Sequence, residues 1–305
     1  MKQQFLSKSK RYQKFSTELK LEIKKITIND PNYPKLLKEI YDPPKELYVW
    51  GELKAEENYP LAVVGTRKVS NYGKQITIDL VRNLAKAGIT IVSGLALGVD
   101  GLAHQACLDV NGRTIAVLGS GLNHIYPAIH RNLAEKIVKS GGAVISEYPP
   151  DTKPEKWTFP VRNRIIAGLS LGVLVIEAPE TSGALITARF ALDSGREVFA
   201  VPGNINQPNS VGTNQLIKLG AKVVTKAEDI LDAFNLALTE QFKKEIKPAN
   251  KEEKIILEIL NEGPLHVDEI IKKSKLEAPL VNSTLVMMEI TGKVKHIGGG
   301  IYSRN

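Results

Sequence analysis

The sequence predicts an α/β protein with a doubly wound, mostly parallel sheet and a small C-terminal winged-helix domain. Two observations lead to this class. In the middle of the chain, short β-branched runs alternate with amphipathic helical stretches, a pattern typical of a parallel sheet covered on both faces. The last part shows three helical stretches and a glycine-tipped hairpin, which is the plan of a winged helix. We therefore divide the 305 residues into a basic tail (1–30), a sheet domain (31–238), a linker (239–252) and a winged-helix domain (253–305).

Each element of the sheet domain follows from its own pattern. After a Pro-rich connector and a short helical segment, Tyr48-Val49-Trp50 is expected to form a small edge strand. Buried strands are then predicted at 61–65, 89–93, 114–119, 143–146, 173–177, 197–201 and 221–224. Helices are predicted between them, at 71–87, 98–109, 128–140, 160–170, 183–194 and 211–219.

The C-terminal domain is read in the same way. Residues 255–260 predict a first helix, and 264–271 lead into a second. Residues 280–290 predict the third, and 292–302 form a hairpin around three consecutive glycines. A helix that reads DNA usually brings Arg, Lys, Asn or Gln to the groove. Because the third helix has Glu289 as its one charge and the domain is neutral overall, we expect a protein-contact or weak accessory module.

Composition restricts the environment more than the function. Of the net charge of +8, residues 1–25 contribute +6, so the overall basicity is a weak argument for nucleic acid. The single cysteine, Cys107, suits a reducing compartment. The chain has no Cys/His cluster with metal-ligand spacing, no apolar run of bilayer length and no secretory leader pattern. We expect a cytoplasmic protein that has no membrane association, no metal and no cofactor.

Distinctive residues gather where the predicted strands end. In an open α/β sheet, ligands bind outside the carboxyl ends of the strands. Glycine beside serine or threonine lets backbone N–H groups close on an anion there, and the next helix dipole supports it. One such turn alone more often serves close packing, but several together favour a phosphate site. The turns are Gly65-Thr66-Arg67, Ser93-Gly94-Leu95-Ala96, Gly119-Ser120-Gly121, Ser182-Gly183 and Pro202-Gly203.

The most informative segment is 156–168, which follows the fourth of these strands. It begins Lys156-Trp157-Thr158-Phe159-Pro160-Val161-Arg162-Asn163-Arg164. Pro160 suits the first turn of a helix, where free backbone N–H groups and arginines bind phosphate and nearby rings stack on bases. The alternative is a solvated basic helix start with Trp157 and Phe159 in the core.

Catalytic machinery is sparse. Gly119-x-Gly121 lacks the third glycine of a dinucleotide fingerprint, and neither a Walker lysine nor a Gly-x-Ser-x-Gly elbow occurs. Asp100 and His104 stand four apart on a predicted helix and either pair or act separately. Glu147 and Glu177 are alternative partners for the arginines of 156–168, and such pairing would make those arginines structural.

Six motifs in chain order resemble the DNA-processing protein A (DprA/Smf) family. They are Val63-Val64-Gly65-Thr66-Arg67, Ser93-Gly94-Leu95-Ala96-x-Gly98-x-Asp100-x-x-Ala103-His104, Leu118-Gly119-x-Gly121-Leu122-x-x-Ile125-Tyr126-Pro127, Phe159-Pro160-x-Arg162-Asn163-Arg164-Ile165-Ile166, Ser182-Gly183-x-Leu185-x-Thr187-Ala188 and Arg196-Glu197-Val198-x-Ala200-Val201-Pro202-Gly203. The resemblance runs from about residue 31 to the C-terminal end of the sequence. It implies an extended Rossmann-like domain that binds single-stranded DNA without catalysing a reaction. Members protect incoming strands during natural transformation, load the RecA recombinase onto them and dimerise through this domain.

The resemblance also implies roles for individual residues. Arg67 would contact phosphate, Lys156 would lie on phosphate and Phe159 near a base. The rest of the DNA-binding set would be Gly65, Thr66, Arg162, Asn163, Arg164, Ser182, Gly183 and Thr187, with Gly94, Gly121, Glu147, Glu177 and Gly203 supporting the pocket.

This chain departs from longer members, which carry an N-terminal helical domain resembling a sterile-alpha-motif fold. Only about 30 residues precede the match here, too few for such a domain. Two other functions remain open. Related Rossmann-like phosphoribohydrolases carry Gly-Gly-x-Gly-Thr followed by a catalytic glutamate, where this chain has 182–187 and then Arg189. A transcription factor acting through the winged helix would instead prefer duplex DNA.

Overall fold

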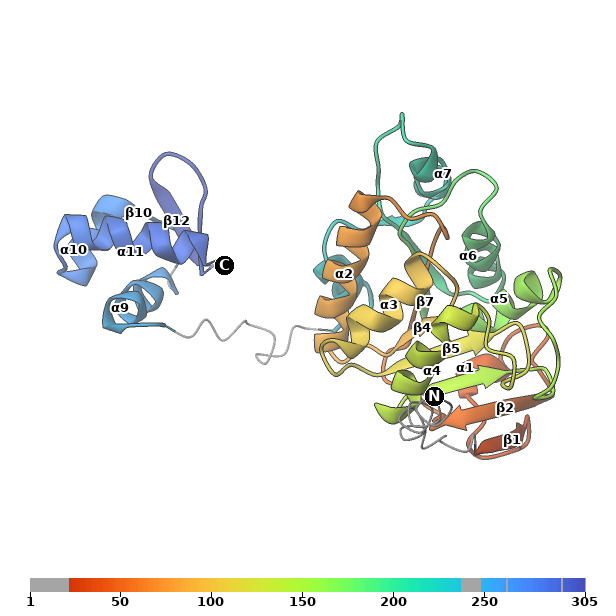
Figure 1. Ribbon diagram of the computed structural model, residues 1–305. Coiled ribbons are helices and arrows are strands. Elements are labelled where there is room, and N and C mark those ends of the chain that lie inside the picture. Colours follow the sequence, from red (N-terminus) through yellow and green to blue (C-terminus); the bar gives the residue numbers. More distant parts are fainter. Residues whose placement is uncertain (1–21, 237–247, 262, 292, 305) are drawn as a thin grey trace, which may run out of the picture. The chain divides into compact units, whose positions relative to one another are not determined.

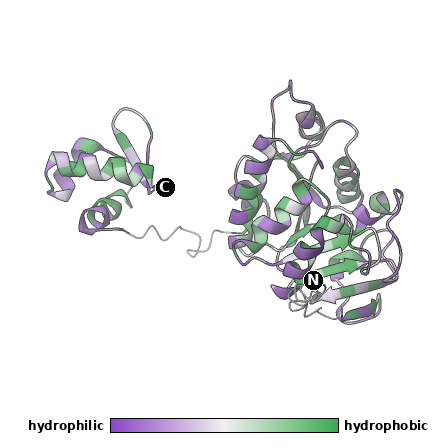
Figure 2. Cartoon of the chain, in the orientation of Figure 1, coloured by the Kyte–Doolittle hydropathy of each residue, from purple (hydrophilic) through white to green (hydrophobic). Residues whose placement is uncertain are grey.

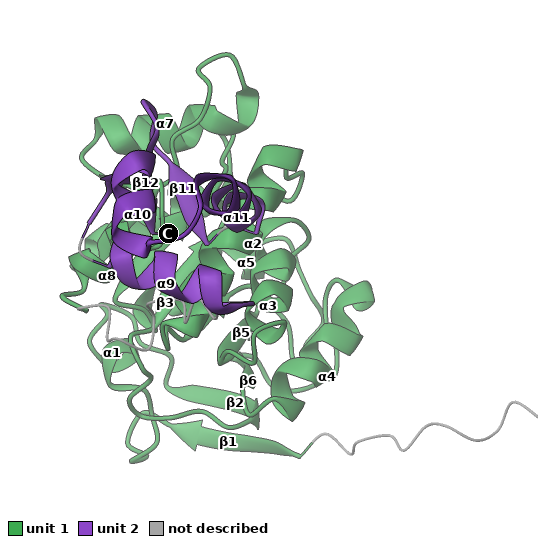
Figure 3. Cartoon of the chain, turned by 90° about the vertical axis from the view of Figure 1, so that its left-hand side faces the viewer, with its two compact units in different colours: residues 1–237 green, residues 238–305 purple. Residues whose placement is uncertain are grey.

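The computed structural model describes residues 22–236, 248–261, 263–291 and 293–304. The chain divides into two compact units, one ending at Ala237 and the other beginning at Leu238 (Figures 1 and 3). Unit 1 is built on a nine-stranded sheet and unit 2 on three helices and a three-stranded sheet. The predicted fold class is therefore confirmed: an α/β domain followed by a small winged-helix domain. In the described part of the chain, no helix has both the length and the apolar character that crossing a bilayer requires.

The sheet of unit 1 is mixed, with a parallel majority. Its strands lie in the order β1 (Ile23–Thr27), β2 (Glu46–Gly51), β6 (Ala143–Ser146), β5 (Thr114–Leu118), β4 (Ile91–Ser93), β3 (Leu61–Val64), β7 (Gly172–Val175), β8 (Glu197–Ala200) and β9 (Lys222–Val223). The strands from β6 to β9 are parallel, whereas β2 is antiparallel to both β1 and β6. The parallel strands from β6 to β8 are short and almost entirely buried, as expected when helices cover both faces, whereas both residues of the edge strand β9 are exposed.

Helices pack on both faces of this sheet and bury separate apolar clusters. One face carries α1 (Lys35–Lys38), α5 (Thr158–Gly168) and α6 (Gly183–Asp193), which meet the sheet through residues such as Leu37, Ile165 and Ala188. The other face carries α2 (Asn71–Lys86), α3 (Val99–Leu108) and α8 (Glu228–Ala233), while α4 (Arg131–Lys139) covers the region near β2. Figure 2 shows the apolar colour concentrated in the strands and the polar colour along the helices.

Three expectations need correction. The predicted tail of 1–30 is wrong for 23–27, because these residues form β1 and pair with β2 from Ile23↔Trp50 to Thr27↔Glu46. As a result β2 is not an edge strand. The predicted helix 128–140 is divided into a 3-10 turn at Ala128–His130 and α4. Residues 1–21 and most of the predicted linker lie outside the described residues, and Lys251 already begins α9.

Unit 2 has the predicted elements and one more strand. Its helices are α9 (Lys251–Leu260), α10 (Val267–Ser274) and α11 (Ala278–Ile290), which share an apolar core around Ile256, Leu285 and Met288. The hairpin is formed by β11 (Val294–His296) and β12 (Ile301–Arg304), and β10 (Leu265–His266) adds a third strand to it. The hairpin tip is made by Gly298, Gly299 and Gly300, all with positive φ.

The strand order determines where a ligand can bind. After β3 the chain builds β4, β5 and β6 on one side, then crosses back so that β7 lies on the other side of β3. Loops leaving the carboxyl ends of β3 and β7 therefore turn in opposite directions, which opens a crevice at this switch point.

Candidate nucleic-acid interface

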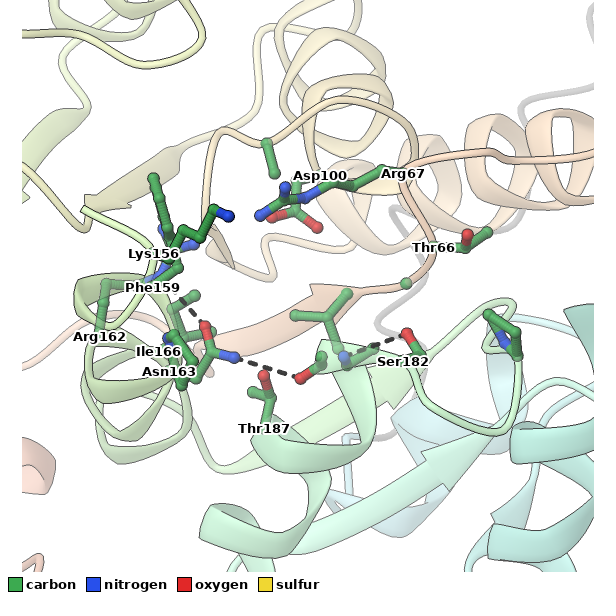
Figure 4. Close-up of a pocket in the computed structure, with 17 residues that line it drawn as sticks. Thr66, Arg67, Asp100, Lys156, Phe159, Arg162, Asn163, Ile166, Ser182 and Thr187 are labelled. Carbon is green, nitrogen blue, oxygen red and sulfur yellow. Dashed lines mark hydrogen bonds between the residues drawn. The ribbon is translucent and has the colours of Figure 1, made fainter. Parts of the chain in front are cut away.

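A cavity of about 410 Å³ occupies this crevice; we call it the strand-end cavity (Figure 4). It draws residues from the exits of β3, β4 and β7 and from the start of α5. Its lining is Val64, Gly65, Thr66, Arg67, Ala96, Asp100, Lys156, Phe159, Pro160, Arg162, Asn163, Ile166, Pro179, Ser182, Gly183, Ala184 and Thr187. Ten of the eleven predicted DNA-binding residues therefore line this cavity, and Arg164 is the exception.

Cations and an aromatic ring meet at the cavity wall. The guanidinium carbon of Arg67 lies 5.6 Å from the centre of the Phe159 ring, a cation–π distance. The Tyr126 ring lies 5.5 Å from Phe159, and Lys156 is exposed nearby. Trp157 is 57% exposed and Phe159 is half-buried, so the alternative that placed both rings in the core is wrong.

The start of α5 is anchored to a neighbouring strand exit. The buried hydroxyl of Thr158 lies within hydrogen-bonding reach of the Gly119 and Glu155 carbonyls. A Cβ at Gly119 would lie only 3.0 Å from the Phe159 ring, so glycine lets α5 approach this closely. Pro160 falls in the first turn of α5, as predicted, where its missing N–H costs nothing.

Arg162 is buried beneath the cavity. It is 4% exposed, and its Nη1 donates to the Gly94 carbonyl at 2.7 Å and to the Val117 carbonyl. Burial lowers the pKa of its guanidinium to about 10, which leaves it charged at neutral pH. Arg162 therefore ties α5 to β4 and β5 and adds a fixed positive charge below the ligand space. The predicted pairing of Arg162 with Glu147 or Glu177 does not occur.

Asp100 is the carboxylate that the sequence did not place in this wall. It is 7% exposed and accepts a hydrogen bond from the Gly94 N–H at 3.1 Å. Burial raises its pKa, while the positive charges of Arg162 and Arg67 act in the opposite direction. Asp100 does not pair with His104, whose Nδ1 lies 2.7 Å from the Thr114 hydroxyl.

Arg164 lies away from the cavity and is held by two carboxylates. Its Nη2 is 2.5 Å from Glu147 and its Nε is 3.1 Å from Asp42, and the side chain is 11% exposed. It is absent from the cavity lining, unlike Arg67 and Arg162. The geometry thus matches the structural alternative for Arg164 and Glu147.

The opposite wall is formed by the start of α6. Ser182 is its N-cap and accepts from the Ala184 N–H at 3.3 Å. A Cβ added at Gly183 would meet no atom within 4 Å, so this turn faces open space. Asn163 Nδ2 donates to the Gly183 carbonyl at 3.2 Å and links the two walls (Figure 4). Thr187 is buried at the floor.

Glu177 supports the site by a route that the sequence did not indicate. Its carboxylate accepts from the Ser70 N–H at 2.9 Å and hydroxyl at 2.5 Å, and from Asn209 Nδ2 at 3.3 Å. Its carbonyl accepts from the Thr66 N–H at 2.8 Å. Ser70 caps α2, so Glu177 fixes both ends of the loop that carries Arg67.

The predicted supporting glycines allow close approaches. A Cβ at Gly94 would lie 2.6 Å from the Arg162 guanidinium. Gly65, which was predicted to bind DNA, is equally close-packed, since a Cβ there would lie 2.6 Å from Val99. At Gly121 it would collide with the Pro149 carbonyl, and at Gly203 with the Ser210 hydroxyl. These positions shape the surroundings of the cavity, although Gly94, Gly121 and Gly203 do not line it. No group of three or more His, Cys, Asp or Glu side chains arranged for a metal occurs within the described ranges.

Tyr126 is an aromatic residue that sequence reasoning missed, although its motif was noted. It is 47% exposed beside Phe159, after a strand exit. The available signal in the sequence was a tyrosine directly before a proline, Tyr126-Pro127, shortly after a predicted strand. In unit 2, α11 exposes Leu280, Val286, Met287 and Ile290.

Fold and site together define an α/β protein with a cationic, aromatic strand-end site and a separate winged-helix unit. Residues 24–235 match the family model of DNA recombination-mediator protein A, and 241–300 match that of the DprA winged helix domain. The chain belongs to the DNA recombination-mediator protein A family, which confirms the resemblance seen in its motifs.

Curated relatives agree with this assignment. The chain is 52% identical to Protein Smf of Escherichia coli over 206 residues, covering 68% of this chain and 55% of that protein. It is 46% identical over 224 residues to the DNA processing protein DprA of Bacillus subtilis, covering 72% of this chain and 75% of that protein. The match thus spans little more than half the length of the Escherichia coli relative.

Two solved structures share the fold of unit 1. DNA processing protein A from Streptococcus pneumoniae matches with a TM-score of 0.66 and 44% identity, over 69% of this chain and 74% of that one. DNA processing protein A from Helicobacter pylori matches with a TM-score of 0.64 and 34% identity, over 71% of this chain and 97% of that one. The latter structure is described in terms of its single-stranded DNA binding mode.

Proposed function

We propose that this protein binds single-stranded DNA in the strand-end cavity. The observation that carries the proposal is the wall where Arg67, Lys156 and Phe159 meet at the switch point of the sheet. The single-strand binding mode described for the Helicobacter pylori relative supports the choice of ligand. The cavity and the aromatic pair suit an unpaired strand, whose bases are free to stack.

The mechanism is electrostatic and independent of sequence. Arg67 and Lys156 hold phosphates, and a base lies against Phe159, where stacking stabilises binding by about 1–3 kcal/mol per base. The open turn at Ser182 and Gly183 presents the backbone N–H of Gly183, at a helix N-terminus, to a phosphate. Arg162, largely buried in the cavity wall, contributes its positive field, and Arg164 acts on the fold alone.

Arg67→Ala tests the site. A charge-assisted phosphate contact contributes enough that its loss weakens binding about 10-fold or more. Fluorescence anisotropy with labelled oligothymidylate at fixed, moderate salt measures this change. Arg67 is exposed, so the melting temperature is expected to stay unchanged. Equal affinity of a folded Arg67→Ala variant and the wild type would remove the site assignment.

Two arginine variants act as controls. Arg189→Ala removes an exposed arginine of α6 that does not line the cavity, and it should bind as the wild type does. Arg164→Ala leaves Glu147 without its ion pair, so we expect a lower melting temperature. Because this variant is expected to be less stable, its affinity for DNA is measured only at temperatures where the variant protein is folded.

At the level of the cell, we propose that the protein acts in the cytoplasm on DNA taken up during natural transformation. There it would protect incoming strands and load RecA recombinase onto them. Family membership and the names of the Bacillus subtilis and Streptococcus pneumoniae relatives support this role. The test is RecA filament assembly on single strands, which should be faster with wild-type protein than with Arg67→Ala.

We also propose a homodimer joined through unit 1. The strand β9 ends the nine-stranded sheet, and an uncovered edge strand favours pairing with another chain. Val223 in β9 is 45% exposed, and Leu219 shortly before the strand is 74% exposed. Leu219→Asp should therefore shift the sedimentation coefficient to that of a monomer, whereas Tyr41→Asp, at a fully exposed residue elsewhere, should not.

Binding rather than catalysis is the role we assign to the cavity. A phosphoribohydrolase would release free base from nucleoside monophosphates, a reaction that chromatography detects directly. Asp100 is the one carboxylate in the lining of the cavity, and it already accepts a hydrogen bond from the Gly94 N–H. For unit 2 we propose an accessory protein-contact role, because the outward side of α11 is apolar; a preference for duplex DNA would contradict it.

A further inference from the structure

A second cationic cavity lies beside the strand-end cavity and has no part in the function proposed above. Its volume is about 670 Å³, and it is bounded by the starts of α2 and α3, the 3-10 turn at Ala128–His130, and α4. Arg67, Lys68, Lys74 and Lys136 contribute side chains to its wall. We call it the lysine cavity.

The charge of the lysine cavity is uncompensated. No Asp or Glu is present in its lining. Within the part of the chain that the structure describes, Lys68, Lys74 and Lys136 form no ion pair with a carboxylate. Asp109 experiences the charge of Lys136 but forms its own ion pair with Arg82 at 2.7 Å. Exposed cations gathered around a hollow without carboxylates attract a polyanion and release its counterions.

The two cavities are adjacent and share lining residues with a third, smaller hollow. This hollow of about 40 Å³ is lined by Arg67, Phe159 and Arg162, which also line the strand-end cavity, and by Leu97, which also lines the lysine cavity. Tyr126 also lines this hollow, and its ring is tilted against that of Phe159 with the ring centres 5.5 Å apart. Arg67 lines all three spaces.

We propose that a single strand bound in the strand-end cavity continues past Arg67 and Tyr126 into the lysine cavity, where its phosphates lie against Lys68, Lys74 and Lys136. This inference rests on the proposed function and extends it to a second segment of the same strand. Leu97 and Ile129 are 47% and 77% exposed at the rim and give sugars and bases an apolar surface. No Phe, Tyr or Trp lines the lysine cavity, so its main contribution is phosphate binding.

The double variant Lys74→Ala/Lys136→Ala tests the lysine cavity against oligothymidylates of about 4 and about 16 residues. The short strand fills the strand-end cavity alone, so the variant should bind it as tightly as the wild type. The long strand should bind the variant about tenfold more weakly, and the slope of log affinity against log salt should fall by about 1.4. Anisotropy across a salt series measures both.

The matched control is Lys86→Ala/Lys139→Ala. It removes one exposed lysine from the last turn of each of the same two helices, α2 and α4, and neither lysine lines the lysine cavity, so the net charge changes equally. It should leave both affinities within about twofold of wild type. If it weakens the long strand as much as the test variant does, the effect is general charge and the inference is overturned.

The remaining outcomes are also distinct. Failure of the wild type to bind either strand would remove the proposed function itself. Normal wild-type binding with no loss of long-strand affinity in the folded variant would remove the lysine cavity alone. Titration calorimetry that finds two short strands per protomer, the second lost in the variant, would show a separate strand in the lysine cavity and overturn the claim of one continuous strand.

Discussion

Arg162 and Arg164 lie on the same turn of α5 but have different surroundings. Arg162 donates hydrogen bonds to backbone carbonyls at the cavity, whereas Arg164 forms ion pairs with Glu147 and Asp42 outside it. A buried guanidinium on carbonyls keeps its net charge, whereas one between two carboxylates is neutralised. Of two neighbouring arginines in one motif, one can therefore supply positive charge to a ligand site while the other stabilises the fold.

His104 shows how a buried group in the same domain makes stability depend on pH. The Thr114 hydroxyl donates to the Ile91 carbonyl at 2.8 Å, so it accepts from His104 Nδ1–H, and Nε2 has no hydrogen-bond partner in the described structure. Burial, followed by the charges of His130 and Arg162, lowers the pKa of His104 from 6.5 to about 3. Protonation thus favours the unfolded chain.

We expect His104 to reduce stability as the pH falls below its unfolded pKa. The unfolded state takes up the proton near pH 6.5 and the folded state near pH 3, so the loss grows through that window. Between pH 7 and pH 5 it amounts to about 2 kcal/mol of unfolding free energy. Urea unfolding at both pH values should show this loss in wild type and its absence in His104→Gln. An unchanged pH dependence in His104→Gln would contradict the assignment, and His124→Gln is the matched control.

At the scale of elements, α5 depends on three separate strand exits. Thr158 anchors it to the end of β5, Arg162 reaches the end of β4, and Asn163 reaches the start of α6 after β7. Because each attachment is a directed hydrogen bond, the helix is fixed in rotation as well as position. This fixes the direction in which its first turn presents Phe159 to the ligand.

Glu177 performs the same task for the loop between β3 and α2. In Glu177→Gln a single side-chain oxygen remains, so it cannot accept from the Ser70 N–H, the Ser70 hydroxyl and Asn209 Nδ2 together, and the donor left without an acceptor costs about 1–3 kcal/mol. We expect a lower melting temperature and several-fold weaker binding of single strands, because the loop carries Arg67. Differential scanning calorimetry and anisotropy measure the two effects. Glu180→Gln, at an exposed carboxylate three residues away, should change neither.

The contrast between predicted and observed elements has physical reasons. The strands from β3 to β8 were predictable because continuous apolar runs suit burial on both faces. β1 was missed because Lys24 and Lys25 interrupt its apolar pattern, and only pairing with β2 makes it a strand. That the cavity turns lie close together was also predictable, because the carboxyl ends of parallel strands meet at one edge of the sheet. Glu147 was one of the two alternative partners that the sequence offered for Arg164. Asp42 and the partners of Glu177 were not predictable, because sequence spacing does not specify which distant carboxylate or donor a side chain meets.

At the scale of the whole molecule, the two units have separate cores. Every residue of both cavities belongs to unit 1, and residues 251–305 carry no net charge. We therefore expect a chain ending at Ala237 to keep its affinity for single strands within about threefold of the full chain at equal salt. Anisotropy and urea unfolding of both proteins measure this. A loss beyond about tenfold, with the shorter chain folded, would assign DNA contacts to unit 2.

The pairing of β3 with β7, from Leu61↔Gly172 to Val64↔Val175, has a consequence for the folding of the protein. It joins segments far apart in the chain, and the walls of the strand-end cavity face each other only after it forms. A partly folded chain therefore has no complete site, and ligand binding reports the finished sheet. By mass action, any strand that binds only this state shifts the folding equilibrium toward it. Protection from proteolysis by added single strands would then extend over the whole of unit 1 rather than over the loops that touch them.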